Sequence, residues 1–333
     1  MSNSKARNKG NFGISKKTLI AIVLFIVIFA GLLLTATFKD LQVSRILTKL
    51  SLPGGQYYAD DIFGRMFETV GCAPVYLMLS FAFHIIFWNV ILRTKDTLLK
   101  WFMAAISVGC AVASYYVMYK DLLTYIIRQI DQEDFLKTPF IGFSLLFMGC
   151  ITCFLGTLAV RNFKDETIKD LLLFAIAVII MAAVANGLVN VIKGPAGRPR
   201  YRAMNMDSAQ MIGGFKNYKR WYQFSGQPDD NFLRWYYGST DACKSFPSGH
   251  TCSAGMSYGL IMLIDALKIK DKKKKIALWV CPIVYTGIVA VSRIMVGAHF
   301  FSDVLVGGTI AFLSMLLVRE IFICKGSHFI KIK

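Results

Sequence analysis

The chain has 333 residues, of which 55% are hydrophobic and 17% are charged, and its formal net charge is +18. Average soluble domains contain about a quarter charged residues, so this composition excludes a disordered chain, a collagen-like fibre and a small disulfide scaffold. A mean hydropathy of +0.51 leaves two classes, an unusually apolar soluble protein and an integral membrane protein.

Run lengths decide between these classes, because a helix needs about 20 mostly apolar residues to cross the hydrocarbon core of a bilayer. Eight segments are rich in apolar residues and have no Lys or Arg at their centres: about 18–38, 70–92, 101–119, 140–160, 171–192, 251–267, 276–292 and 303–318. The sequence therefore predicts an all-α fold, a polytopic membrane bundle of about eight transmembrane helices.

The first segment also has features of a secretory signal, because basic residues up to Lys17 precede it. However, the apolar run Leu19–Leu34 is long for a signal peptide, and Thr35-Ala36-Thr37 makes a poor cleavage site. We therefore expect an uncleaved first helix.

The distribution of Lys and Arg predicts the orientation of the bundle, because cytoplasmic loops carry an excess of these residues. With the N-terminus inside, the inner segments hold 21 Lys and Arg residues and the short outer segments hold 8. The long segment 193–249 is left out, since long loops translocate regardless of charge. Both termini are thus predicted to be cytoplasmic, and we expect no nucleic-acid partner because the cations are dispersed among short loops.

Two predicted outer segments, Leu41–Leu50 and Leu122–Phe135, mix apolar and charged residues at helical spacing. Such segments can lie flat at the membrane interface. The alternative is that they are ordinary connecting helices.

Strong polarity appears at three places, and all three map to the outer ends of predicted spans. The first follows the fifth span, where a Gly- and Pro-rich stretch carries four cations: Lys193, Arg198, Arg200 and Arg202. Turns in this stretch can aim cations at one anion, whereas Arg198 and Arg202 could equally contact anionic lipid headgroups.

The second place is the predicted start of the sixth span, at Pro247-Ser248-Gly249-His250. A helix N-terminus offers free N–H groups to an anion. Ser248 adds a hydroxyl, Gly249 permits a close approach of the backbone, and His250 can transfer protons near neutral pH.

The third place lies between the last two spans and contains Ser292, Arg293, His299 and Asp303. His299 and Asp303 are four residues apart, so on a helix they share a face. A carboxylate there can bind one imidazole nitrogen and leave the other free to attack.

Together these stretches resemble the type 2 phosphatidic acid phosphatase family, in the superfamily that includes vanadium haloperoxidases and glucose-6-phosphatase. The family signature is K-x6-R-P, P-S-G-H and S-R-x5-H-x3-D. The second and third parts match fully, and the first matches from Lys193 to Arg200, with Tyr201 where proline is usual. The resemblance covers roughly residues 171–320, whereas the first four predicted spans have only generic membrane character.

The resemblance implies a role for each matching residue. His299 would be the nucleophile that forms a phosphohistidine, oriented by Asp303, and His250 would protonate the leaving oxygen and then activate water. The phosphoryl oxygens would be held by Lys193, Arg200, Ser248, Gly249 and Arg293. Cationic side chains would stabilise the charge that a metal otherwise stabilises, so we expect no metal and no cofactor.

Other polar residues have less specific interpretations. We expect a neutral packing role for His84, which lies within the second predicted span. Asn186 and Asn190 share a face leading to Lys193 and could support it, and Trp221 and Trp235 could form a lid or belong to a simply folded outer loop.

The sequence thus predicts a basic cytoplasmic N-terminus (1–17), four transmembrane helices with outer interfacial segments (18–160), a catalytic core with outer loop 193–249 (161–323), and a cytoplasmic tail (324–333). The predicted function is a membrane phosphatase acting on a lipid phosphate or diphosphate at the outer face, with polyprenyl diphosphate, phosphatidic acid and phosphatidylglycerophosphate as possible substrates. The alternatives are a phosphatase of a water-soluble phosphomonoester, a lipid phosphotransferase, and a catalytically silent lipid-binding or transport protein.

Overall fold

The computed structural model describes residues 16–48, 61–128, 133–206, 209, 213–237 and 239–325, and regular structure within these ranges is helical throughout. The long helices are α1 (Lys16–Leu47), α3 (Ala73–Arg93), α4 (Thr97–Arg128), α5 (Pro139–Arg161), α7 (Leu172–Ala196), α13 (Lys272–Met295) and α14 (Phe301–Val318). The short α-helices are α2 (Ile62–Val70), α6 (Asp165–Asp170), α8 (Tyr201–Met204), α10 (Asp230–Tyr237), α11 (Gly249–Ala254) and α12 (Gly259–Ala266). Short 3₁₀ helices occur at η1 (Glu133–Lys137), η2 (Gly214–Asn217) and η3 (Gly255–Tyr258). A short π-helix, η4 (Arg319–Ile323), follows α14.

Seven helical stretches in the described part of the chain are long and apolar enough to cross a membrane, which confirms the predicted polytopic bundle. The other predicted span, 251–267, is built from α11, η3 and α12 in succession rather than from one continuous helix. The interruption coincides with close packing, because a Cβ atom at Gly255 would lie 2.6 Å from Cβ of Ala311 in α14.

The main apolar core joins the two halves of the chain. It lies where α3 and α7 pack together and where α7 packs against α14. Its fully buried members include Ile85, Phe174, Met181, Met256 and Met315. The N-terminal and C-terminal helices therefore share one core along their length.

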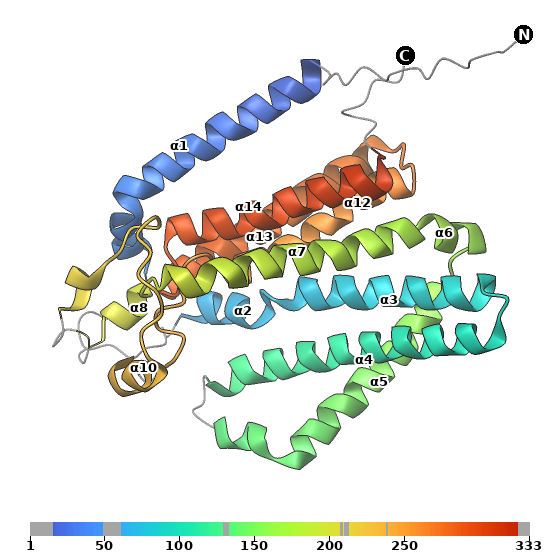
Figure 1. Ribbon diagram of the computed structural model, residues 1–333, viewed down its shortest axis with the longest axis horizontal. Coiled ribbons are helices and arrows are strands. Elements are labelled where there is room, and N and C mark those ends of the chain that lie inside the picture. The colour runs from blue at the N-terminus through green and yellow to red at the C-terminus, as the bar shows by residue number, and fades with distance from the viewer. Residues whose placement is uncertain are drawn as a thin grey trace, which may run out of the picture.

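Helix direction gathers the polar motifs at one end of the bundle. The C-terminal ends of α1, α4, α7 and α13 lie there with the N-terminal ends of α2, α11 and α14 and with the segment that carries α8 and α10 (Figure 1). The start of α1 and the end of α14 lie toward the opposite end (Figure 1).

Helix α1 differs from the rest of the bundle, since only its C-terminal half has a buried stripe. Ala36, Asp40 and Ser44, four residues apart, are buried, and α1 packs against α14 and α13. The first half of α1 diverges from the bundle (Figure 1) and exposes its apolar side chains, as expected for a surface that faces lipid.

The two segments predicted to lie at the interface do not form separate helices. Residues 41–47 continue α1, and residues 122–128 continue α4. Residues 133–137 form the 3₁₀ turn η1. Residues 49–50 and 129–132 lie outside the described ranges.

Candidate active site

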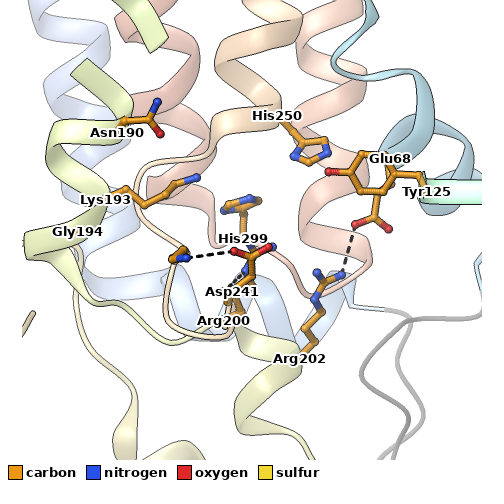
Figure 2. Close-up of a pocket in the computed structure, with 11 residues that line it drawn as sticks. Glu68, Tyr125, Asn190, Lys193, Gly194, Arg200, Arg202, Asp241, His250 and His299 are labelled. Atoms are coloured by element: carbon orange, nitrogen blue, oxygen red, sulfur yellow. Dashed lines mark hydrogen bonds and ion pairs between the residues drawn. The ribbon is translucent and has the colours of Figure 1, made fainter. Parts of the chain in front are cut away.

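A cavity of about 500 Å³ lies at the motif end of the bundle and brings the three polar stretches together. Figure 2 shows its lining, with both histidines and Lys193 pointing toward one space. The lining residues are Glu68, Tyr125, Asn190, Lys193, Gly194, Arg200, Arg202, Asp241, Lys244, His250 and His299.

His299 precedes α14 and is 1% exposed. Its Nδ1 atom lies 2.7 Å from the carbonyl oxygen of Ser245. A carbonyl only accepts hydrogen bonds, so Nδ1 carries the proton and Nε2 keeps its lone pair. Burial lowers the pKa of His299 to about 3, which keeps the imidazole neutral near pH 7. His299 therefore has the tautomer and charge that a nucleophile needs.

Asp303 lies in the first turn of α14, whereas His299 precedes the helix, so the two residues are close without sharing a helix face, and the contact of Asp303 with the imidazole is indirect. Its Oδ2 atom is 3.8 Å from Nδ1 of His299, beyond hydrogen-bond distance. Oδ2 instead accepts hydrogen bonds from Ser245 Oγ (2.5 Å) and from the backbone N–H of Phe300 (2.8 Å). Asp303 thus fixes the residue whose carbonyl holds His299.

Arg198 contacts buried carboxylates, and this corrects the interpretation that it meets lipid headgroups. It is 1% exposed, with Nη1 2.5 Å from Asp303 and Nη2 2.9 Å from Asp40 of α1. Its Nε atom donates to the carbonyl of Lys219, and its guanidinium lies 4.2 Å from the centre of the Phe300 ring. A guanidinium withdrawn from water needs such partners, because unpaired buried charge is costly.

Three cations of the first motif line the cavity. Lys193 lies in the last turn of α7, and a Cβ atom at Gly249 would lie 3.2 Å from its Nζ atom, so the glycine leaves room for the ammonium group. Arg200 donates from Nε to the carbonyl of Asp241 at 2.8 Å. Arg202, the other residue interpreted as a headgroup contact, is buried and lines the cavity.

Arg293 is fully buried and donates from Nη2 to Glu68 at 2.8 Å. Its Nε and Nη1 atoms have no hydrogen-bond partner among the described residues. The Ser248 hydroxyl caps α11, accepting from the backbone N–H of Thr251 at 3.3 Å, and its backbone N–H donates to the carbonyl of Asp303 at 3.0 Å. Phosphate binding by Ser248, Gly249 and Arg293 stays a prediction.

His250 lies in the first turn of α11 and lines the cavity. Its Nε2 atom is buried and has no partner within the part of the chain that the structure describes. The ring of Tyr125, near the end of α4, meets the imidazole edge to face at 5.3 Å. Figure 2 shows the two rings on the same side of the cavity.

Three residues that the sequence analysis did not single out contribute to the site from N-terminal helices. Asp40 comes from α1, Glu68 from α2 and Tyr125 from α4. The only signal in the sequence is that both acidic residues lie near the ends of apolar segments in a strongly basic protein. Their partners are more than 130 residues away, so spacing alone could not identify them.

The other polar residues are accounted for individually. His84 is buried between Thr157 and Tyr115, at 3.1 Å and 3.3 Å, in agreement with a packing role. Asn190 lines the cavity, whereas Asn186 donates to the carbonyl of Ala182. In the segment between α8 and α11, the indole N–H of Trp221 donates to Thr37 in α1, and Trp235 is 79% exposed.

Within the described ranges, no group of three or more His, Cys, Asp or Glu side chains is placed to hold a metal ion.

Comparison with known proteins identifies relatives of the motif-bearing part. Residues 171–323, from α7 to η4, match the PAP2 superfamily. Over 77 residues, or 22% of this chain, the sequence is 35% identical to phosphatidylglycerophosphatase B of Bacillus subtilis (strain 168). That match spans 37% of the relative's length. No solved structure matches the chain.

Proposed function

We propose that the chain is an integral membrane phosphatase of the PAP2 superfamily that hydrolyses a lipid phosphate or diphosphate, because residues 171–323 match that superfamily. The observation that carries the proposal is the state of His299. Its Nδ1–H is held by the Ser245 carbonyl, and the ring lines a cavity rich in Lys and Arg.

In the first step, Nε2 of His299 attacks phosphorus and the bond from phosphorus to the lipid oxygen breaks. His250 donates a proton to the departing oxygen, which leaves as an alcohol, or as a phosphate when the substrate is a diphosphate. Lys193, Arg200 and Arg293 stabilise the charge on the equatorial oxygens, which is the main requirement of phosphoryl transfer.

In the second step, water attacks the phosphohistidine and His250 accepts a proton from it. The bond from nitrogen to phosphorus breaks, inorganic phosphate is released and His299 regains its lone pair. The same cations serve both steps, so we expect activity to persist in saturating chelator. Loss of activity that added magnesium or zinc restores would contradict this mechanism.

A lipid substrate is supported by the position of the cavity, because its lining includes Tyr125 and Lys193 near the C-terminal ends of the membrane-length helices α4 and α7. The similarity to a protein named phosphatidylglycerophosphatase B makes phosphatidylglycerophosphate a substrate to test beside phosphatidic acid and polyprenyl diphosphate. Phosphate release from these three lipids and from glucose 6-phosphate, in detergent micelles, separates a lipid phosphatase from an enzyme of soluble phosphomonoesters.

We further propose that the cavity faces outside and that both termini are cytoplasmic. The excess of Lys and Arg at the opposite end supports this orientation. After removal of native cysteines, a cysteine at Tyr222 should react with an impermeant thiol reagent from outside, and one at Lys273 should not. The reverse pattern would contradict the orientation.

The mechanism is tested by acid-quenched labelling with radioactive phosphate, followed by peptide mapping. We expect label on His299 and none in His299→Ala, while the matched control His328→Ala in the C-terminal tail should label like the wild type. Label on another residue, or undiminished labelling in His299→Ala, would contradict the mechanism.

A further inference from the structure

Glu68 lines the catalytic cavity although α2 lies outside the part of the chain that matches the superfamily. Local structure explains how it reaches the site. Asp61 caps α2 by accepting the backbone N–H of Gly64 at 2.7 Å. A Cβ atom at Gly64 would lie 2.2 Å from Cγ1 of Val296, so α2 sits directly on the turn that follows α13. Glu68 comes one helical turn later.

One carboxylate oxygen of Glu68 contacts two arginines. Its Oε1 atom accepts from Arg293 Nη2 at 2.8 Å and from Arg202 Nη1 at 3.5 Å, and Glu68 is 7% exposed. Two guanidinium groups this close would repel each other in a poorly solvated site. The negative charge of the carboxylate offsets this repulsion, and its Oε1 atom holds both guanidinium groups close together.

The N–H groups of Arg293 that Glu68 does not engage could bind a phosphoryl group. Glu68 engages only Nη2, whereas Nε and Nη1 have no partner in the described parts of the chain. Phosphoryl oxygens could accept hydrogen bonds from these atoms without displacing Glu68. The carboxylate would also lower the net positive charge that a bound phosphate experiences.

We propose that Glu68 is a positioning residue that orients Arg293 and Arg202 for the phosphoryl group, and that its charge limits how tightly the site retains the phosphate product. This inference rests on the proposed phosphatase function. It makes the N-terminal helices part of the active site rather than a separate membrane anchor.

Two conservative substitutions separate the effect of the side-chain length of Glu68 from the effect of its negative charge. Glu68→Gln keeps an oxygen acceptor at the same distance but removes the negative charge. It should tighten binding of inorganic phosphate roughly fivefold, which is about 1 kcal/mol for one charge in a partly solvated site. It should also lower kcat because product leaves more slowly. Glu68→Asp keeps the charge but shortens the side chain, and displacing Arg293 by about 1 Å can lower kcat up to ~100-fold.

The experiment uses the full chain in detergent and measures kcat and KM for phosphatidic acid. Phosphate affinity is measured separately, from protection against thermal unfolding by inorganic phosphate, which requires no turnover. The matched control is Glu166→Gln, because Glu166 is exposed in α6 at the other end of the bundle (Figure 1). The control should resemble the wild type in all three quantities.

The expected result is tighter phosphate binding in Glu68→Gln, with kcat lowered in both variants and no tightening of phosphate binding in Glu68→Asp. The inference is overturned if phosphate affinity in Glu68→Gln stays within twofold of wild type. It is also overturned if kcat, phosphate affinity and melting temperature all fall together in both variants, as a purely structural role would require. If the wild type hydrolyses none of the lipids but binds phosphate, the proposed function fails while the affinity series still tests Glu68.

Discussion

The N-terminal helices α1–α5 and the C-terminal helices α7–α14 contribute different charged groups to one site. The C-terminal part supplies both histidines, the cations and the carboxylates Asp241 and Asp303, whereas the N-terminal part adds the carboxylates Asp40 and Glu68. Helix α1 also differs from α7 in burial, since 6% of the apolar window in α1 is buried against 44% in the stretch that contains α7. Clustered buried cations need counter-charges, and in this fold the N-terminal helices supply part of them.

The strongest test of this division is to remove chemistry from the C-terminal part alone. His299→Ala should abolish turnover, because it removes the nucleophile. His250→Ala should lower the rate by about 10²–10⁴-fold, the usual contribution of proton transfer. A substrate with a good leaving group should recover part of the first step in His250→Ala, and phosphoenzyme should then accumulate. Stopped-flow phosphate release with acid-quench labelling measures both, and equal rates in the two variants would contradict the assigned roles.

The next test removes a counter-charge from the N-terminal part. Asp40→Asn should destabilise the protein by about 3 kcal/mol, the lower end for breaking a buried ion pair, because Arg198 keeps its second partner, Asp303. Unfolding in detergent measures this change, and Asp170→Asn in α6 is the exposed control. A loss below about 0.5 kcal/mol, the range of ordinary surface changes, would mean that α1 is only an anchor.

A comparable or smaller effect on stability is expected from a change in pH. The pKa of His299 is lowered by burial from 6.5 to about 3, so between these values the unfolded chain binds more protons than the folded one. Stability contributed by neutral His299 should therefore be fully present above pH 6.5 and be lost as pH falls toward 3, with a slope of at most about 1.4 kcal/mol per pH unit. Unfolding of wild type and His299→Gln from pH 4 to 7 measures the difference, and parallel curves would contradict it.

The smallest expected effect is the loss of kcat when the aromatic ring of Tyr125, which α4 contributes to the site, is removed. Its edge-to-face contact with His250 should be worth about 0.5–1.5 kcal/mol beyond the burial of the ring. Tyr125→Leu should thus reduce kcat several-fold, whereas Tyr125→Phe keeps the ring and should lose less. Steady-state kinetics on phosphatidic acid compare the two, and equal losses would assign the effect to the hydroxyl group instead.

Much of the fold follows from apolar run length. A segment of about 20 apolar residues has few alternatives to a membrane helix, because backbone groups in lipid must be paired within the segment. The interruption between α11 and α12 was not predictable, since it depends on how Gly255 meets Ala311 across the bundle. The true length of α1 was also missed, because charged residues such as Lys39 and Asp40 end an apolar run without ending the helix.

Within the site, local spacing predicted the residues that share a short stretch of chain. His299 and Asp303 lie close together, although His299 precedes the helix that carries Asp303, and His250 lies in the first turn of a helix. The direct contact between His299 and Asp303 was not found, because Ser245, more than 50 residues away in sequence, supplies the carbonyl that binds Nδ1. A headgroup contact likewise stayed open as an alternative for Arg198 and Arg202, because their acidic partners are far away in the sequence.

The sequence by itself determined the membrane bundle, the end at which the motifs gather, and the histidines and cations available for phosphoryl transfer. These features depend on hydrophobicity and on spacing within single helices or turns, which are local properties. Only the tertiary structure decided which carboxylate neutralises which arginine and which atom holds the imidazole. Those choices depend on helices that are distant in sequence and meet only after packing, at distances of 2.5–3.5 Å.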